Sequence, residues 1–276
     1  MHNTYLLRPR SADGLNPRLL TVGTERHRSP REDAKGPQAR RQAEESRVSA
    51  LVRTSEETYT RAAVKLYHFP ASPNARRVNI TIATLGLDVV DEIVDISKGE
   101  SRSDEFLKIN PNGKIPTLVD GDFVLWESNA IAQYLCDVAR AKGNAEAERL
   151  LPSSPRGRAD VTRWQAWQMT QLGPAAGILT FQNLVKRMFM GQEPDAAEVE
   201  RGLALFHTSA KILDASLAGR TWLVGDDVTL ADLANGVTLM YASLANIPVA
   251  DYPNIVAWLA NLEKLEAWQK TAPRFG

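Results

Sequence analysis

The spacing of apolar residues along this chain predicts strands and helices in turn. Short apolar runs at residues 64–69 and 89–96 are typical of strands. The segment between them, residues 76–85, fits both the alternation of a strand and the period of a helix. Because Ser72-Pro73 is a helix start and Gly86 is a helix stop, we predict a helix there.

The pattern up to about residue 140 continues to alternate. Pro111 ends a short helix, and Asp120-Gly121 is a hairpin signal between two apolar segments. The predicted segments are a polar loop at 98–103, a helix at 104–109, a turn at 110–113, strands at 117–119 and 123–126, and a helix with Ser128 as N-cap. This order predicts an α/β layer in which a parallel strand pair is extended by an antiparallel hairpin.

Helical periodicity dominates the rest of the chain. Residues 141–157 contain Gly143-Asn144 and a Pro- and Ser-rich stretch, so we expect a linker or helix-end loop. Thr229 and Asp232 have the spacing of a capping box. The predicted helices cover 158–172, 175–190 after a break at Gly173-Pro174, 195–217, a segment from Thr229, and a last segment from Pro253 with Ile255, Leu259, Leu262 and Leu265 on its buried face. This part is predicted to be an all-α bundle.

The first 62 residues differ in composition from the remainder. They hold eleven Arg, one Lys and eight acidic residues, a net charge of +4, and no Ile, Phe or Trp. Such a segment cannot bury enough apolar surface to offset its ordering entropy, so residues 1–62 are expected to be a disordered extension. A basic partner-binding tail, a dispensable extension and a start codon assigned too far upstream all stay open. The predicted domains are residues 63–142 and 156–276.

Overall composition narrows the class of function. The 276 residues carry a formal net charge of zero, which gives no electrostatic case for a nucleic-acid partner. No apolar run approaches the ~20 residues of a membrane span, so no membrane partner is expected. Cys136, the single cysteine, favours a reducing compartment and hence the cytoplasm, and it is read as a core residue. The scattered histidines give no metal-ligand spacing, so no metal is predicted.

Ser72 is the first candidate for chemistry. As N-cap it would place a hydroxyl among unpaired N–H groups at a helix start. Such a place favours an anion, because the helix dipole and the free donors converge there. The same pattern also fits a serine that only caps its helix.

Four separated motifs resemble those of the cytosolic glutathione transferase family. Residues 70–78 are similar to its serine-type active-site turn, closest to the phi class, with a Ser-Pro-Asn portion similar to the nu class. Residues 110–116 resemble the loop before its cis-proline, Glu127-Ser128 its glutathione-binding pair, and residues 229–232 its helical-domain capping box. The resemblance covers about residues 64–272. It implies a thioredoxin-like N-terminal domain, an all-α C-terminal domain, glutathione as co-substrate and a homodimer.

The resemblance gives Ser72 and Asn74 roles at the glutathione sulfur. An unperturbed thiol has a pKa of about 8.5, so little of it is thiolate at neutral pH. Lowering that pKa to about 6.5 makes the thiolate the major form and requires roughly 2.7 kcal/mol of differential stabilisation. Ser72 would donate to the sulfur, and Asn74 would add an amide donor from the first helical turn.

The other implied contacts hold the rest of the tripeptide. Ile115, before a Pro116 that the family implies is cis, would offer backbone groups to the cysteinyl portion. Ser128 would bind the γ-glutamyl carboxylate and Glu127 the α-amine. Lys114 would meet the glycine carboxylate.

Further residues are weaker candidates on the same resemblance. Lys98 or Arg102 could also meet the glycine carboxylate, although each could instead be a charged loop residue that faces solvent. Trp164, Trp167 and Phe181 are candidates for the pocket of the second substrate, although aromatic residues at helical spacing are more often core.

These residues favour a glutathione transferase whose thiolate attacks a small electrophile. A glutathione-dependent reductase of disulfides or peroxides is the first alternative, because the Ser-Pro-Asn turn is compatible with it. The second is a non-catalytic glutathione-fold binding or regulatory protein. No motif identifies the electrophile.

Overall fold

A four-stranded sheet forms one part of the structure, a computed structural model that describes residues 63–273. The expected disordered extension at residues 1–62 lies outside the described residues. The strands are β1 (Lys65–His68), β2 (Val90–Ile93), β3 (Thr117–Asp120) and β4 (Phe123–Trp126), in the order β2-β1-β3-β4. β1 and β2 are parallel, and β3 pairs antiparallel with both β1 and β4. The predicted parallel pair extended by a hairpin is confirmed.

β2 is shorter than the predicted strand at residues 89–96. Asp95 ends the extended backbone, because its side chain accepts from the N–H of Ser97 and starts a 3₁₀ turn at Ile96–Lys98. A second 3₁₀ turn at Glu100–Arg102 follows, within the segment expected to be an irregular loop. Local capping by a short polar side chain therefore ends the strand before the last residues of the apolar pattern that predicted it.

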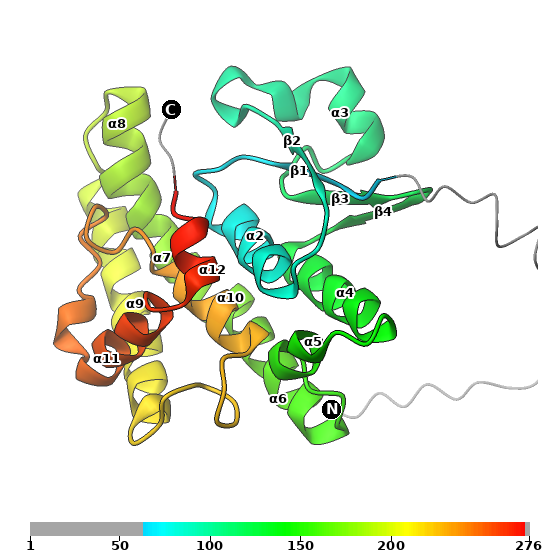
Figure 1. Ribbon diagram of the computed structural model, residues 1–276. Helices are drawn as coiled ribbons and strands as arrows, with labels where there is room; N and C mark the ends of the chain where they lie inside the picture. Colours follow the sequence, from blue (N-terminus) through cyan, green and yellow to red (C-terminus); the bar gives the residue numbers. More distant parts are fainter. Residues whose placement is uncertain (1–62, 274–276) are drawn as a thin grey trace, which may run out of the picture. The chain divides into compact units, whose positions relative to one another are not determined.

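Three helices cover the two faces of the sheet. α2 (Pro73–Leu85) and α4 (Ser128–Ala141) lie together on one face and α3 (Asp104–Ile109) lies on the other, as Figure 1 shows. α2 begins after Ser72, and it ends at Gly86, whose φ of 60° is the left-handed conformation expected of a C-cap. The predicted helices at 76–85 and 104–109 are confirmed, with α2 starting earlier.

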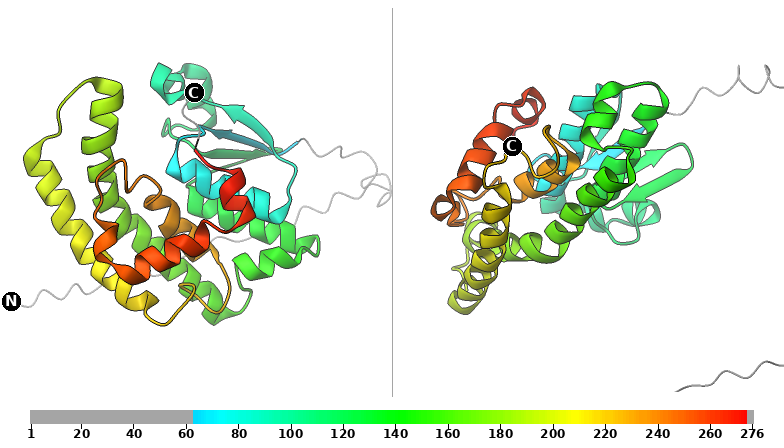
Figure 2. Two further views of the ribbon diagram at one scale, coloured as in Figure 1. Left: turned by 60° about the vertical axis from the view of Figure 1, so that its left-hand side comes forward. Right: turned by 90° about the horizontal axis from the view of Figure 1, so that it is seen from below.

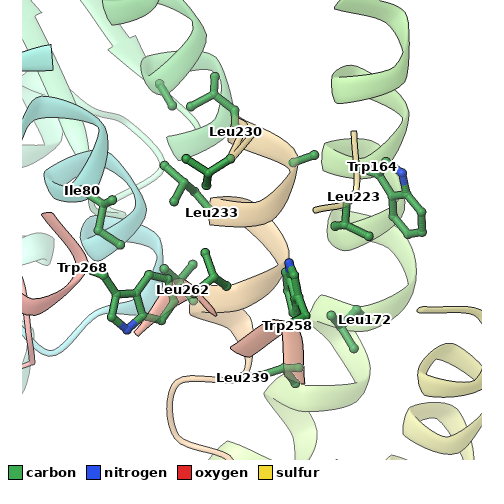
Figure 3. Close-up of a cluster of buried hydrophobic side chains, with 14 of the residues drawn as sticks. Ile80, Trp164, Leu172, Leu223, Leu230, Leu233, Leu239, Trp258, Leu262 and Trp268 are labelled. Atoms are coloured by element: carbon green, nitrogen blue, oxygen red, sulfur yellow. The ribbon is translucent and has the colours of Figure 1, made fainter. Parts of the chain in front are cut away.

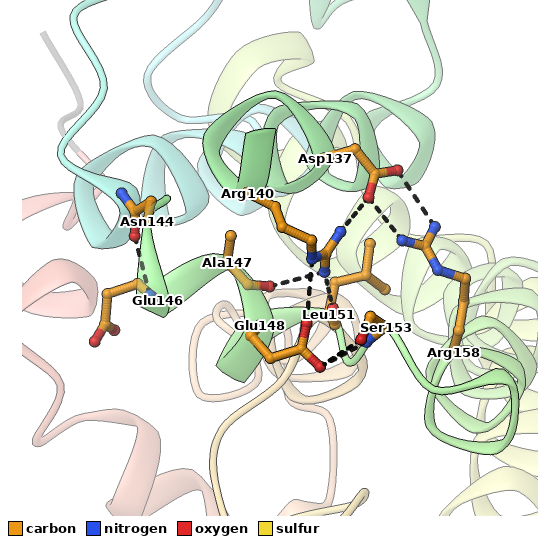
Figure 4. A network of polar contacts seen from close by, with 9 residues as sticks. All are labelled: Asp137, Arg140, Asn144, Glu146, Ala147, Glu148, Leu151, Ser153 and Arg158. Atoms are coloured by element: carbon orange, nitrogen blue, oxygen red, sulfur yellow. Dashed lines mark hydrogen bonds and ion pairs between the residues drawn. The ribbon is translucent and has the colours of Figure 1, made fainter. Parts of the chain in front are cut away.

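α5 (Ala145–Leu150) occupies the segment that was expected to be a linker or helix-end loop. Asn144 caps this helix, and Arg140 at the end of α4 reaches it. Arg140 Nε lies 3.1 Å from Glu148 Oε2, and its Nη2 donates to the carbonyls of Ala147 and Leu151 (Figure 4). The linker prediction was wrong because a six-residue helix shows little periodicity of its own and depends on such contacts.

The helical part continues without the break expected at Gly173-Pro174. α6 (Pro155–Trp167) and α7 (Gly173–Thr180) are joined by a π-helical turn at Gln168–Leu172. The N–H of Gly173 bonds the carbonyl of Gln168, five residues back. Because Pro174 has no N–H and its ring crowds the preceding turn, the wider turn lets the helix continue where a regular one would break. A second π turn, Phe181–Val185, leads into α8 (Lys186–Met190).

The remaining helices complete the all-α part. They are α9 (Ala196–Leu217), α10 (Leu230–Thr238), α11 (Pro253–Leu262) and α12 (Glu266–Lys270). The single last helix that was predicted from Pro253 is two helices, and Leu265 lies at the start of the second. α12 lies beside α2 in both figures, and Arg76 Nη2 donates to the Trp268 carbonyl at 3.0 Å (Figures 1 and 2).

α10 lies at the centre of the core. Every residue from Leu230 to Val237 is buried, and the side chains around this helix come from α2, α6, α11 and α12 (Figure 3). The predicted capping box is confirmed, since Thr229 accepts from a helix N–H while Asp232 accepts from the N–H of Thr229. The Asp232 carboxylate also accepts from Trp258 Nε1 at 3.0 Å, which ties α10 to α11.

Candidate active site

A cleft of about 520 Å³ lies between the α/β layer and the helical part. Its lining brings together six of the seven residues predicted from sequence: Asn74, Lys114, Ile115, Pro116, Glu127 and Ser128. The opposite wall comes from the two π-helical turns and α7. A π turn places extra backbone on one side of a helix and is frequent at functional sites.

Ser72 lies at the start of α2, next to this lining. It has the extended backbone of an N-cap, and its Oγ accepts from the Ala75 N–H at 3.3 Å, as predicted. Ser72 itself is half-buried and is not among the lining residues, but Pro73 and Asn74 directly after it are. The predicted sulfur donor is thus at the edge of the cleft.

The turn before Ser72 is held from the helical part. The Ser72 N–H donates to the Phe69 carbonyl at 3.0 Å, and the Tyr241 hydroxyl donates to the Ala71 carbonyl at 2.7 Å. Tyr241 follows α10 and is 170 positions away from Ala71. Sequence reasoning missed Tyr241, because nothing local to it points to a contact at that distance.

The loop at residues 110–116 forms the next wall. The Ile115–Pro116 bond is cis, as the family resemblance implied. β3 begins only at Thr117, so Ile115 lies outside the strand ladder. Asn110, which is buried, shapes the loop by donating from Nδ2 to the Lys114 carbonyl at 2.8 Å and to Thr117 Oγ1 at 2.9 Å. The Lys114 side chain is exposed at the mouth of the cleft.

The junction of β4 and α4 corrects one prediction. Ser128 is the first helical residue and Glu127 is the N-cap, with a φ of 71° that is rare outside glycine. The Ser128 hydroxyl therefore does not cap the helix but accepts from Arg77 Nη1 at 2.6 Å. The Glu127 side chain is exposed at the cleft, while its carbonyl accepts from the Ile131 N–H at 2.9 Å.

Arg77 is a cleft residue that sequence reasoning did not identify. It is 2 % exposed, and its guanidinium also donates from Nη2 to the Ala234 carbonyl at 3.1 Å. Burial lowers the pKa of this guanidinium to about 10, and the charge of nearby Glu127 opposes that shift. Arg77 remains protonated at neutral pH, so the floor of the cleft carries a buried positive charge.

A chain of side-chain amides lies beside Ser128. Gln165 Nε2 donates to Asn129 Oδ1 at 3.3 Å, and Gln168 Nε2 donates to Thr238 Oγ1 at 3.0 Å. Gln168 and Thr238 both line the cleft. Asn129 Nδ2 also donates to Gln168 Oε1 at 3.5 Å, so these contacts join α4, α6, the π turn at Gln168–Leu172 and α10 around one end of the site. No local motif predicts them.

Of the three aromatic residues expected at the second-substrate pocket, one lies in the cleft. Phe181 lines the cleft, together with Met169 and Val185. Trp164 and Trp167 do not, because their face of α6 points to the core. Trp164 is 5 % exposed and stacks edge-on against Trp167 with ring centroids 5.2 Å apart.

The weaker candidates lie outside the cleft lining. Lys98 Nζ pairs with Asp95 Oδ2 at 3.0 Å, and Arg102 Nη1 donates to the Asn112 carbonyl at 3.2 Å. Cys136 is fully buried, and burial raises the pKa of its thiol to about 12, which confirms the reading of a core residue. Over residues 63–273, no three His, Cys, Asp or Glu side chains gather as a metal ion would require.

Comparisons with known proteins agree with this arrangement. Residues 62–137 match the family Glutathione S-transferase, N-terminal domain, and residues 178–266 match Glutathione S-transferase, C-terminal domain. Glutathione S-transferase 3 of Zea mays is 38% identical over 214 residues, covering 76% of this chain and 93% of the maize protein.

Solved structures give the same result. Glutathione S-transferase III in its apo form aligns with a TM-score of 0.67 and 35% identity, covering 78% of this chain and 99% of that one. Glutathione S-transferase-I bound with lactoylglutathione aligns with a TM-score of 0.67 and 29% identity, covering 76% of this chain and 99% of that one. The chain belongs to the glutathione S-transferase family, and its relatives include plant enzymes similar to the phi class. No helix among those described has the length and apolar character to cross a bilayer.

Proposed function

We propose that this protein binds glutathione in the cleft and activates its thiol for attack on a small electrophile. The observation that carries the proposal is the position of Ser72. It caps α2 at the edge of a cleft whose other walls are the cis-proline loop and the β4–α4 junction. A relative whose structure holds lactoylglutathione supports a glutathione-type ligand here.

The tripeptide would lie along the α/β side of the cleft. Ile115 would pair its backbone N–H and C=O with the cysteinyl portion, since it lies outside the ladder of β3. Ser128 would donate to the γ-glutamyl carboxylate and Glu127 would meet the α-amine. Lys114, exposed at the mouth, would attract the glycine carboxylate.

Ser72 would then stabilise the thiolate. Its hydroxyl can donate to the sulfur, and the first N–H groups of α2 add positive potential at the same place. Asn74, which is exposed to the cleft, would contribute a second donor. The thiolate sulfur forms a bond to an electrophilic carbon, and the leaving group departs with the electron pair of its own bond.

The second substrate would rest against the helical wall. Met169 and Phe181 expose 48% and 44% of their surface there, so this wall favours an apolar electrophile. A homodimer in the cytoplasm completes the proposal, on the resemblance to the family.

Conjugation of glutathione to an activated aryl halide tests the proposal. Ser72→Ala should lower kcat/KM about a hundredfold, the rate equivalent of roughly 2.7 kcal/mol. The matched control is Ser154→Ala. Ser154 caps α6 before Pro155 and accepts from the Gly157 N–H at 3.2 Å, the same Ser-Pro helix start without a cleft. Its loss should cost stability but leave kcat/KM unchanged.

The possible results separate the three functions. An equal fall in both variants would assign Ser72 a structural role only. Turnover of a mixed disulfide or a peroxide with no conjugation would favour the reductase. Binding of glutathione without turnover of any of these substrates would favour a binding protein.

A further inference from the structure

The floor of the cleft holds a buried cation with an incomplete set of partners. Arg77 donates to the Ser128 hydroxyl and to the Ala234 carbonyl, both neutral acceptors, and its Nε has no hydrogen-bond partner. Among the described residues, no carboxylate lies within ion-pair distance of it, and Glu127 acts on it only through its charge. A buried charge with neutral partners is costly, and an anion bound nearby would compensate it.

The contact with Arg77 also fixes what Ser128 can do. A hydroxyl has one donor and two acceptor sites, and a guanidinium can only donate. Arg77 Nη1 at 2.6 Å therefore occupies an acceptor site of the Ser128 oxygen. The Ser128 hydrogen has no acceptor among the residues that the structure describes, and Ser128 lines the cleft. Ser128 is thus set to donate into the cleft, toward an acceptor that carries negative charge.

We propose that Arg77 is the positioning residue that makes the Ser128 hydroxyl a dedicated donor and so selects ligands with a carboxylate at this end of the cleft. The inference rests on the proposed function, in which that carboxylate belongs to the γ-glutamyl portion of glutathione. Arg77 acts through Ser128, and its charge makes the donated hydrogen bond stronger than that of a free serine.

Arg76, the neighbouring residue, provides a matched control. It is also buried, at 5% exposed, and also has an unpartnered Nε. Its Nη2 donates to the Trp268 carbonyl, and its guanidinium lies 4.3 Å from the centre of the Trp268 ring. Arg76 does not line the cleft. Its loss should destabilise the contact of α2 with α12 without changing ligand choice.

The experiment measures the Kd of the full-length protein for three ligands by calorimetry. They are glutathione, 4-aminobutyryl-cysteinylglycine, which lacks only the α-carboxylate, and glutaryl-cysteinylglycine, which lacks only the α-amine. The wild type should prefer glutathione to the first analogue by about tenfold or more. Arg77→Gln should remove most of that preference and leave the preference over the second analogue unchanged. Arg76→Gln should keep both preferences while lowering the thermal midpoint.

A merely structural role of Arg77 would change all affinities together and leave the ratios unaltered. A wild-type ratio in Arg77→Gln would therefore overturn the inference. If that variant does not fold, Ser128→Ala keeps Arg77 and removes the donor, and an unchanged ratio there overturns it equally. A wild type that binds glutathione no better than either analogue contradicts the inference alone. A wild type that binds none of the three contradicts the proposed function with it.

Discussion

Asp232 offers the sharpest test of what holds the helical part together. Its side chain is fully buried, and both oxygens accept two hydrogen bonds each. Oδ1 accepts from the Leu223 N–H at 2.8 Å and Trp258 Nε1 at 3.0 Å. Oδ2 accepts from the N–H and the hydroxyl of Thr229 at 2.9 and 3.0 Å. One carboxylate therefore joins the start of α10 to α11 and to the segment before the helix.

Asp232→Asn replaces one oxygen with an amide group that cannot accept. If Oδ1 is replaced, two buried N–H donors lose their partner; if Oδ2 is replaced, the Thr229 N–H loses its partner, whereas the Thr229 hydroxyl can turn and accept from the new amide. At about 1–3 kcal/mol for each unsatisfied donor, the loss of one or two partners should lower the free energy of unfolding by roughly 1 to 6 kcal/mol. The upper end of that range is a large share of the roughly 5–15 kcal/mol of a typical protein. The corresponding fall in Tm is roughly 2 to 20 °C.

Urea unfolding followed by circular dichroism, at one protein concentration, measures this loss. Asp195→Asn is the matched control, because Asp195 also caps a helix but is exposed and accepts only from the N–H groups of Ala197 and Glu198. Asn caps as well as Asp, so that variant should stay close to the wild type. An Asp232→Asn protein within about 0.5 kcal/mol of the wild type would refute the reasoning.

Three further predictions concern single side chains. Tyr241→Phe removes the hydroxyl that holds the Ala71 carbonyl, so kcat/KM for conjugation should fall roughly three- to tenfold with little loss of Tm; unchanged kinetics would contradict a positioning role. Cys136, fully buried with a pKa raised to about 12, should resist alkylation at pH 8 in the native protein and react fully in urea, as intact mass would show. Burial lowers the pKa of His68 below its ordinary 6.5 despite Asp91 at 3.3 Å, so the unfolded chain takes up the proton first as pH falls. The free energy of unfolding should then decline below about pH 6.5, and less steeply in His68→Gln; parallel profiles would assign the decline to other groups.

Features that a few neighbouring residues decide could be predicted from the sequence. Ser72 and Gly86 bound α2 through local capping, and Asp120-Gly121 closes the hairpin. The capping box of Thr229 and Asp232 likewise needs only four residues in a row. The prediction of the cis bond before Pro116 came from the resemblance to the family rather than from any such pattern.

Features that depend on distant partners, or on an unusual helical turn, could not be predicted from the sequence. The pattern at Glu127-Ser128 suggested an N-cap serine, but Arg77, 51 positions away, accounts for the Ser128 hydroxyl. Pro174 suggested a break, yet a π turn before it keeps the helix continuous. Tyr241 reaches the active-site turn across 170 positions. For Arg77 and Tyr241, no short window of sequence contains both partners of the contact. The π turn is a local alternative to a break, and apolar periodicity does not distinguish the two.

The central claim is that Ser72 activates the thiol of bound glutathione. The ultraviolet absorbance of the thiolate, followed against pH in the binary complex, tests it most directly in the wild type, Ser72→Ala and the control Ser154→Ala. We predict an apparent pKa of about 6.5 in the wild type and in Ser154→Ala, returning toward about 8.5 in Ser72→Ala. A bound thiol that titrates near its free value in all three proteins would contradict the account, because the cleft would then hold glutathione without activating it.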